Sequence, residues 1–515
     1  MPATDCKHTK SIARNAGIIS VATLLSRILG FLRDLILAAV LGAGPIADAF
    51  FVAFRLPNIL RRLFAEGSLT MAFIPVYTRY FKEHDSETAD SIARGVQIWL
   101  LILLLPLCLA AIIFSSKITA FIAPGFTSSA DIFGLTSKLI AICFPYIIFI
   151  SAVALCMGIL NSRGHFLAPA LAPCILNLTL ISAAGIAWFF NINIALALAW
   201  GVLAAGSGQW ILQQPFLKKK KFYWTGRTEL GHPGVKRIGK LMLPTILGAA
   251  AYQLNILIGT MLASMLSFGS ISYLYYADRL VQFPLGVFGV AISTAALPSL
   301  STLVTQDNIQ EFKETLSTSI TLTLFISIPA TAGLIGLGNP LLSVLFEHGQ
   351  FDSFAVTATD LALFGYAIGL PAFSSVRSLI SSFYALEDTR TPVIISIVCM
   401  LLNIAAGYML MQYLQHLGLA IAVSLASWTN VFLLAVFLKR RIGPWGEVFK
   451  KSLKTTYLSL LLLGVSLAAA HTFKPWVCLA LIPVLILGYM WLALKLKIPE
   501  AELIVSSLSK KLLNK

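Results

Sequence analysis

Long apolar runs, separated by short polar segments, follow one another along almost the whole of this chain. Most of the runs are long enough for a helix of roughly 20 residues, the length that crosses the hydrocarbon core of a bilayer. Only helices and closed barrels can span a membrane, because backbone polar groups find no water there. The pattern predicts an all-α polytopic membrane protein with about fourteen transmembrane helices.

The composition supports the same fold class. Of 515 residues, 58% are hydrophobic and only 12% are charged, whereas a soluble domain carries about 25% charged residues. The formal net charge is +16, a value also typical of nucleic-acid-binding proteins. Here, however, the basic residues cluster at the ends of the apolar runs and form no separate polar module. We therefore expect no nucleic-acid partner.

Lysine and arginine are distributed unevenly between alternate loops. One set of loops holds the basic runs 218–221, 439–441 and 450–454, and loops of the opposite parity are nearly free of basic residues. Both ends of the chain are basic and belong to the rich set. Because cytoplasmic loops carry the excess of Lys and Arg, we expect an even number of spans and two cytoplasmic termini.

Short motifs recur at one offset and indicate an internal repeat. The segment 161–169 lies between two spans, and the segment 384–392 does the same 223 residues later. Ile74-Pro75 and Leu297-Pro298 are separated by the same offset. The repeat predicts two six-helix lobes related by a parallel repeat, a plan seen in some transporters. The predicted boundaries are 10–217 for the N-lobe, 218–235 for a basic cytoplasmic linker, 236–441 for the C-lobe, and 442–515 for helices 13 and 14 with a cytoplasmic tail.

Arginine stands in or beside several predicted spans, at Arg27, Arg33, Arg61, Arg279 and Arg377. A charge at the centre of a bilayer costs roughly 2.5–3.5 kcal/mol on insertion scales, so such residues face a bundle interior or a wet cavity. Few acidic residues accompany these cations. Together they predict a cavity that receives an anion.

The first span allows two interpretations. Seven residues return a helix to nearly the same face, so Ser26 lies above Arg33 and Arg27 lies above Asp34. The four side chains could form a cationic stripe that faces a cavity. Alternatively, an Arg27–Asp34 arrangement only locks helices together.

Span 8 carries Tyr275, Tyr276, Asp278 and Arg279 near its beginning. The tyrosines suit an interfacial aromatic belt better than a surface that stacks on sugars. Asp278 partly compensates the charge of its neighbour Arg279. Arg377, in span 10, has no acidic neighbour, and facing a cavity and pairing with another helix are equally open for it.

These residues lie in motifs that resemble the MurJ/MviN family of lipid II flippases. The resemblance rests on Ser-Arg-x-Leu-Gly-Phe-x-Arg-Asp at 26–34 and on Asp-Ala-Phe-Phe-Val-Ala-Phe-x-Leu-Pro-Asn-x-Leu-Arg-Arg-x-Phe-Ala-Glu-Gly at 48–67. Tyr-Tyr-Ala-Asp-Arg-Leu at 275–280 and Asp-Thr-Arg-Thr-Pro at 388–392 also match. The similarity extends over nearly the whole chain.

The resemblance implies a member of the MOP exporter superfamily in the bacterial cytoplasmic (inner) membrane, which flips lipid II for cell-wall synthesis by alternating access. Lipid II is undecaprenyl diphosphate that carries a disaccharide-pentapeptide. Arginine binds a diphosphate well, because its guanidinium is always charged and donates two parallel hydrogen bonds. The family's cavity arginines match Arg27, Arg33, Arg61 and Arg279, and its acidic residue near the outer gate matches Asp48. We add Ser26 as a candidate substrate-binding residue. The other candidate gating or supporting residues are Asp34, Glu66, Asp278, Gln282 and Arg377.

One position departs from the family pattern. Some members carry Glu three residues after the span-8 arginine, where this chain has Gln282. A carboxylate-based gate is therefore in doubt at that position. The family implies coupling to the membrane potential or to an ion, and we expect no cofactor. Membrane lipids and cell-wall synthases are the other expected partners.

Two other functions, a transporter and an enzyme, are alternatives to a lipid II flippase. A related exporter of another polyprenyl-diphosphate-linked saccharide would need a similar cationic cavity. A membrane-embedded glycosyl- or phosphotransferase would need a general base or a metal-binding carboxylate cluster. Glu66, Glu387 and Asp388 are the nearest candidates, and they form no such arrangement in the sequence. We assign no catalytic and no metal-binding residue.

Overall fold

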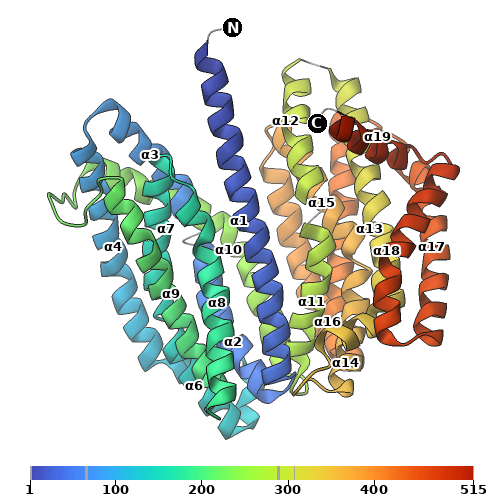
Figure 1. The fold of residues 1–515 in the computed structure, drawn as a ribbon, viewed down its shortest axis with the longest axis horizontal. Helices are drawn as coiled ribbons and strands as arrows, with labels where there is room; N and C mark the ends of the chain where they lie inside the picture. The colour runs from blue at the N-terminus through green and yellow to red at the C-terminus, as the bar shows by residue number, and fades with distance from the viewer. Residues whose placement is uncertain (1–2, 64–67, 287–289, 307, 514–515) are drawn as a thin grey trace. The chain divides into compact units, whose positions relative to one another are not determined.

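The computed structural model describes residues 3–63, 68–286, 290–306 and 308–513. Every regular element in these ranges is a helix, so the predicted all-α class is confirmed. The chain forms two compact units, residues 1–269 and 270–515. Figure 1 gives the order of the elements along the chain.

In its described residues, the first unit contains ten α-helices and a short 3-10 helix. In chain order these are α1 (Ala3–Leu41), α2 (Pro45–Leu63), α3 (Leu69–Glu83), α4 (Ser86–Ile113), α5 (Ser115–Ile122), η2 (Pro124–Ser128), α6 (Ala130–Cys143), α7 (Tyr146–Ser162), α8 (Leu167–Phe189), α9 (Ile194–Lys219) and α10 (Pro233–Ser264). Helix α8 packs against α1 and α9, and α7 packs against α9. Helix α10 packs on α3 in this unit, although the repeat predicts that the C-lobe begins at 236. The lobe boundaries stay a prediction.

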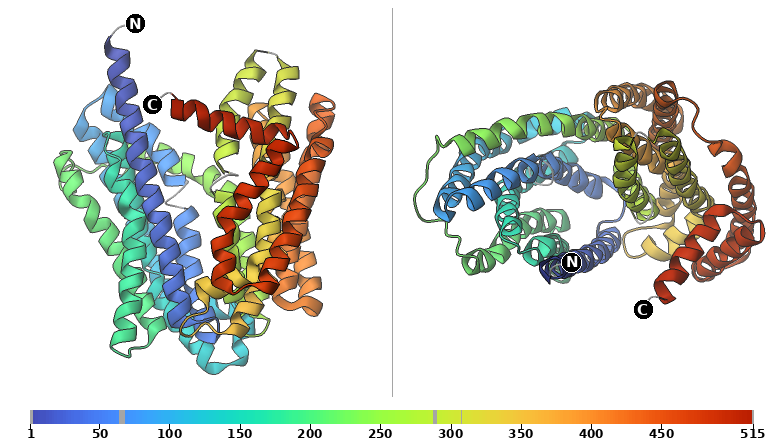
Figure 2. Two further views of the ribbon diagram at one scale, coloured as in Figure 1. Left: turned by 45° about the vertical axis from the view of Figure 1, so that its right-hand side comes forward. Right: turned by 90° about the horizontal axis from the view of Figure 1, so that it is seen from above.

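The second unit is built around one long helix, α13. Its elements are α11 (Ser270–Pro284), α12 (Val290–Thr305), α13 (Ile309–Phe346), α14 (Ser353–Ala367), α15 (Leu370–Ala385), α16 (Arg390–Ile442), α17 (Val448–Thr472), α18 (Pro475–Lys495) and α19 (Pro499–Leu513). Helices α17 and α18 pack on α13, as Figures 1 and 2 show. Gly336 permits this approach, because a Cβ there would lie 2.4 Å from Cβ of Ser466.

A sharp bend divides the 53-residue helix α16 into two arms. Gln415 lies at φ 49° and ψ −131°, outside the helical region. Gly418 lies so close to the preceding arm that a Cβ would come within 2.4 Å of the carbonyl oxygen of Leu410. The bend separates two apolar segments of the chain, one on each arm.

The loop between α15 and α16 is anchored by the carboxylate of Asp388. Burial opposes ionisation there, but several partners lower the pKa of this carboxyl below its ordinary value. The backbone N–H of Thr391 and its hydroxyl donate at 3.0 and 2.8 Å. The backbone N–H of Arg390 donates at 3.1 Å, and the guanidinium of Arg441 donates at 2.6 Å. The end of α16 is thereby tied to the loop that begins it.

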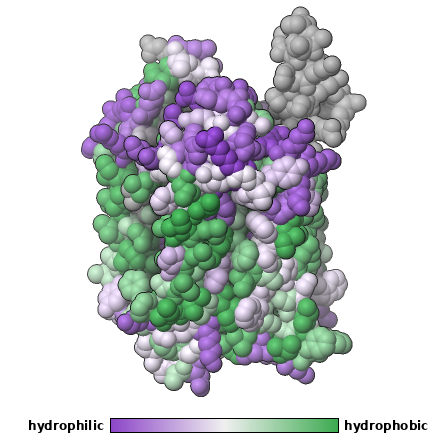
Figure 3. Space-filling model, turned by 90° about the vertical axis from the view of Figure 1, so that its left-hand side faces the viewer, coloured by the Kyte–Doolittle hydropathy of each residue, from purple (hydrophilic) through white to green (hydrophobic). Residues whose placement is uncertain are grey.

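Nine helical stretches within the described ranges are long and apolar enough to cross a membrane. Figure 3 shows the corresponding pattern on one face, where apolar side chains fill the middle band and hydrophilic side chains lie above them. A polytopic membrane protein is therefore confirmed. The predicted count of fourteen spans remains a prediction.

Candidate functional site

Arg33 and Asp34 lie in the interior of the first unit, with only 8% and 2% of their surfaces exposed. Nε and Nη2 of Arg33 donate to Oδ1 of Asp34 at 3.0 and 2.7 Å. Nη1 of Arg33 donates to Oδ1 of Asn177 on α8 at 2.9 Å. A buried charge of this kind is tolerated because an opposite charge and a polar group compensate it.

Asn177 also holds α1 against α8. Its Nδ2 donates to the backbone carbonyl of Ser26 at 3.0 Å, and a Cβ at Gly30 would lie 3.5 Å from the same amide. Sequence reasoning missed Asn177, although a single amide in the apolar run Ile-Leu-Asn-Leu is a usable signal. A buried polar group almost always has a partner, so such a residue predicts a contact with another helix.

The remaining predicted residues of α1 are more accessible. Arg27 is exposed, and Ser26 is half-buried with its carbonyl bound to Asn177. Asn177 therefore joins the side chains of Arg33 and Asp34 and the backbone carbonyl of Ser26 in one network. Arg27 remains at the surface of the unit.

Helix α2 places Asp48 at its buried end and Arg61 at its opposite end. Asp48 is 1% exposed, and its Oδ2 accepts a hydrogen bond from the backbone N–H of Gly269 at 2.6 Å. Gly269 has φ +97°, a region that favours glycine. Arg61 is half-buried and donates through Nε and Nη2 to Asn58 at 3.1 and 2.9 Å. Glu66 lies outside the described residues.

In the second unit, α11 carries the other predicted arginine. The guanidinium of Arg279 lies 4.7 Å from the ring centre of Tyr275, and its Nη2 donates to the Tyr275 hydroxyl at 3.2 Å. Tyr276 is completely buried against other aromatic rings. Of the two tyrosines, Tyr276 therefore belongs to the core, while Tyr275 orients the arginine.

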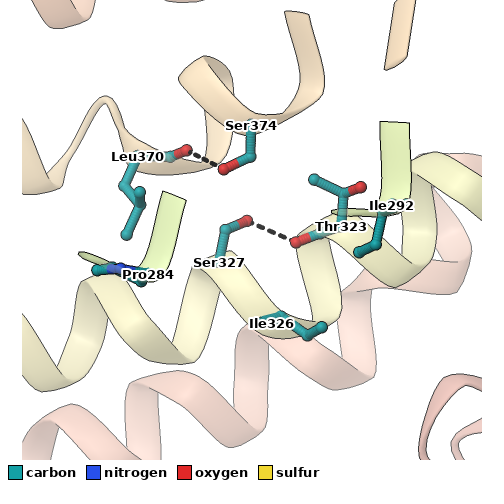
Figure 4. Close-up of a pocket in the computed structure, with 7 residues that line it drawn as sticks. All are labelled: Pro284, Ile292, Thr323, Ile326, Ser327, Leu370 and Ser374. Carbon is teal, nitrogen blue, oxygen red and sulfur yellow. Dashed lines mark hydrogen bonds between the residues drawn. The ribbon is translucent and has the colours of Figure 1, made fainter. Parts of the chain in front are cut away.

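The supporting residues of the second unit lie on two helices. Asp278 accepts a hydrogen bond from Nε2 of Gln282 at 3.3 Å on α11. Arg377 is exposed on α15. The second unit also contains a small cavity of about 10 Å³. Its lining includes hydroxyl side chains, from Thr323 and Ser327 of α13 and Ser374 of α15. Figure 4 shows that Ser327 and Ser374 donate to backbone carbonyls of their own helices, and the space is enough for only about one water.

Two further arginines of the first unit form buried contacts that the sequence analysis did not anticipate. Arg163 pairs with Asp90 and with the hydroxyl of Tyr77. Arg94 is 3% exposed and donates to backbone carbonyls of the linker.

Comparison with known proteins places this geometry in a family. A family model described as lipid II flippase MurJ matches residues 37–487. The probable lipid II flippase MurJ of Buchnera aphidicola subsp. Acyrthosiphon pisum is 38% identical over 423 residues, which are 82% of this chain and 83% of the relative. The corresponding protein of Vibrio cholerae is 38% identical over 437 residues, which are 83% of this chain and 82% of the relative.

Solved structures agree. A structure of lipid II flippase MurJ in an inward closed conformation has a TM-score of 0.79 and 30% identity, and the match covers 96% of this chain and 99% of that one. An inward-facing multidrug resistance transporter of the MATE family and MOP superfamily has a TM-score of 0.69 at 16% identity, over 81% of this chain and 94% of that one. The second likeness concerns the fold alone. The chain belongs to the lipid II flippase MurJ family, a family of membrane transporters.

Proposed function

We propose that this protein is a flippase that moves lipid II from the cytoplasmic to the outer leaflet of the bacterial inner membrane. The observation that carries the proposal is the family match over residues 37–487, together with arginines on α1, α2 and α11. The site is a transport site, and no residue of it is assigned a catalytic role. Both termini are proposed to be cytoplasmic.

The proposed roles of the arginines differ because their surroundings differ. Arg27 is exposed, so its guanidinium group can turn toward a diphosphate, whereas the guanidinium of the half-buried Arg61 is oriented by Asn58. Arg33 already serves Asp34 and Asn177, and it supplies a fixed positive charge. Arg279, supported by Tyr275, contributes from the second unit. Low dielectric strengthens the attraction between these charges and a diphosphate.

Alternating access completes the proposal. The diphosphate and sugars would enter a cationic cavity, while the polyprenyl tail stays in lipid. Asp48 would support the closed outer side through its bond to Gly269. Coupling to the membrane potential or to an ion, and contact with cell-wall synthases, belong to the proposal as well.

Reconstituted liposomes test the proposed function. Fluorescent lipid II is placed in both leaflets, and its transfer is followed by chemical quenching of the outer leaflet. Arg27→Ala and Arg279→Ala should slow transfer by more than about tenfold, since each removes a charge-assisted contact of roughly 1.5–3 kcal/mol. Arg79→Ala is the matched control, because Arg79 is exposed and pairs only locally with Glu83 on α3. Normal transfer by both test variants would contradict the proposed site.

A further inference from the structure

The basic linker between α9 and α10 is fixed to α4 by one buried side chain. Nε of Arg94 donates to the carbonyl of Arg227 at 2.9 Å, and Nη1 donates to the carbonyls of Tyr223 and Thr225 at 3.0 and 3.3 Å. Gly226 has φ +136°, and a Cβ on it would lie 3.0 Å from Cζ of Arg94. The linker therefore forms a fixed wall of the first unit.

A cavity of about 370 Å³ lies beneath this wall, a volume within the range of sites for small ligands. Trp224 and Thr228 of the linker line one end. The remaining walls come from α4, α7 and α9, with Phe149, Ala152 and Trp210 among the lining side chains. None of the predicted transport residues lines it.

The cavity changes from polar to apolar with depth along α4. Arg94, Gln97 and Leu101 line it at a spacing of three and four residues, which places them on one helix face over about 10 Å. Oε1 of Gln97 is buried, with no hydrogen-bond partner among the described residues. Ile98, beside Gln97, is 36% exposed and opens this face of the cavity toward its surroundings.

The polar end also lies in a strongly positive region. Lys218, Lys219, Lys221 and Arg227 are exposed on the linker and on the end of α9. Arg94 itself is already engaged, and Arg227 shares an ion pair with Glu229 that is exposed and therefore weak. The exposed lysines, and Arg227 when it exchanges Glu229 for a phosphate, are the cations available to a headgroup. Basic sites between membrane helices attract anionic lipids at roughly 1 kcal/mol for each Lys or Arg near the surface.

We propose that this cavity binds one anionic glycerophospholipid from the leaflet on the side of the linker. The phosphate lies near Lys221 and Arg227, the ester groups meet the amide of Gln97, and one acyl chain follows Leu101 and Phe149. An ester carbonyl only accepts, so it takes an N–H of Gln97 Nε2, while the unpartnered Oε1 can accept from a hydroxyl of the headgroup. This lipid is a bound component of the first unit and is not the transported molecule.

Native mass spectrometry of the full-length protein tests the proposal with two lipids of identical chains, phosphatidylglycerol and phosphatidylcholine. The wild type should retain phosphatidylglycerol about tenfold better than phosphatidylcholine. Ala152→Phe fills the cavity and should abolish this retention. Ala110→Phe is the matched control, since Ala110 is exposed elsewhere on α4.

A second pair of variants tests the charges without touching the core. Lys221→Gln combined with Arg227→Gln should reduce the retention of phosphatidylglycerol to that of phosphatidylcholine. Arg79→Gln combined with Lys82→Gln, on the exposed face of α3, should leave it unchanged. This pair decides the outcome if Ala152→Phe impairs folding.

Two results would overturn the assignment. Equal retention of both lipids by the wild type would show that the basic linker does not select an anionic lipid. Preferential retention of undecaprenyl diphosphate that is blocked by Ala152→Phe would instead show that the cavity binds the transport substrate. Neither result depends on a measured transport rate, so the lipid site and the proposed transport function can fail separately.

Discussion

Removal of Asp90 should destabilise the first unit strongly, because its carboxylate is the counter-ion of a buried arginine. The side chains of Arg163 and Asp90 are only 5% and 6% exposed. The Tyr77 hydroxyl donates to Oδ1 of Asp90 at 2.8 Å and accepts from Nε and Nη2 of Arg163 at 2.9 and 2.7 Å. The guanidinium also donates to the carbonyl of Lys220 and lies 5.0 Å from the ring centre of Phe81.

The expected magnitude follows from this burial. Breaking a buried ion pair on one side costs about 3–5 kcal/mol, because the remaining charge stays buried without its partner. For a unit of about 250 residues, 1 kcal/mol shifts Tm by roughly 2–4 °C, so Asp90→Asn should lower Tm by roughly 6–20 °C. Arg163→Met should have a similar effect. The double variant should lose less than the sum of the two, since no unpaired charge remains.

Thermal unfolding in one detergent, at one protein concentration and scan rate, measures these shifts. Glu83→Gln is the control, because it breaks an exposed ion pair with Arg79 on α3 and should change Tm by little. Additive losses in the double variant would show that Asp90 and Arg163 act independently. A shift below about 2 °C for Asp90→Asn would refute the assignment of a desolvated pair.

Three further predictions concern single positions. Gly418→Ala should cost more than about 1 kcal/mol, because its Cβ would meet the Leu410 carbonyl, and thermal unfolding measures the loss. Asn177→Leu should lower stability by about 1–3 kcal/mol by leaving Arg33 short of an acceptor, and should also slow lipid II transfer. Asp388→Asn should lower Tm at pH 7. Because the folded pKa of Asp388 is lowered, its contribution exists above the unfolded value of about 3.9 and vanishes as the pH falls through the folded value, so the difference from wild type should shrink in acid.

The sequence alone predicts the fold class and the helices that carry the arginines, because both depend on local apolar patterns. It also predicts that the charges at 27, 33, 61 and 279 stand on helices. The partners of these side chains on other helices depend on tertiary packing, which the sequence does not reveal. Helical spacing places Arg27 and Asp34 on one face of the first helix, but it does not show whether they are in contact. In the structure, the long side chain of Arg33 curls onto its neighbour Asp34, although adjacent residues do not normally face each other on a helix.

The network of Tyr77, Asp90 and Arg163 is a second set of contacts that the sequence does not predict. Each residue is unremarkable in its own segment, since a basic loop residue and a tyrosine near a span end are common. Their sequence separations are 13, 73 and 86 residues, and no local period connects them. Only the packing of α3, α4 and the loop after α7 brings them together.

The most direct test of the transport account is the affinity of the purified protein for lipid II, measured for the wild type, Arg27→Ala, Arg279→Ala and the double variant. If the guanidinium groups of Arg27 and Arg279 both take part in binding the diphosphate, each single variant should weaken binding by about 10- to 100-fold. The double variant should then fall short of the product of the two effects. Wild-type affinity in both single variants would contradict the account.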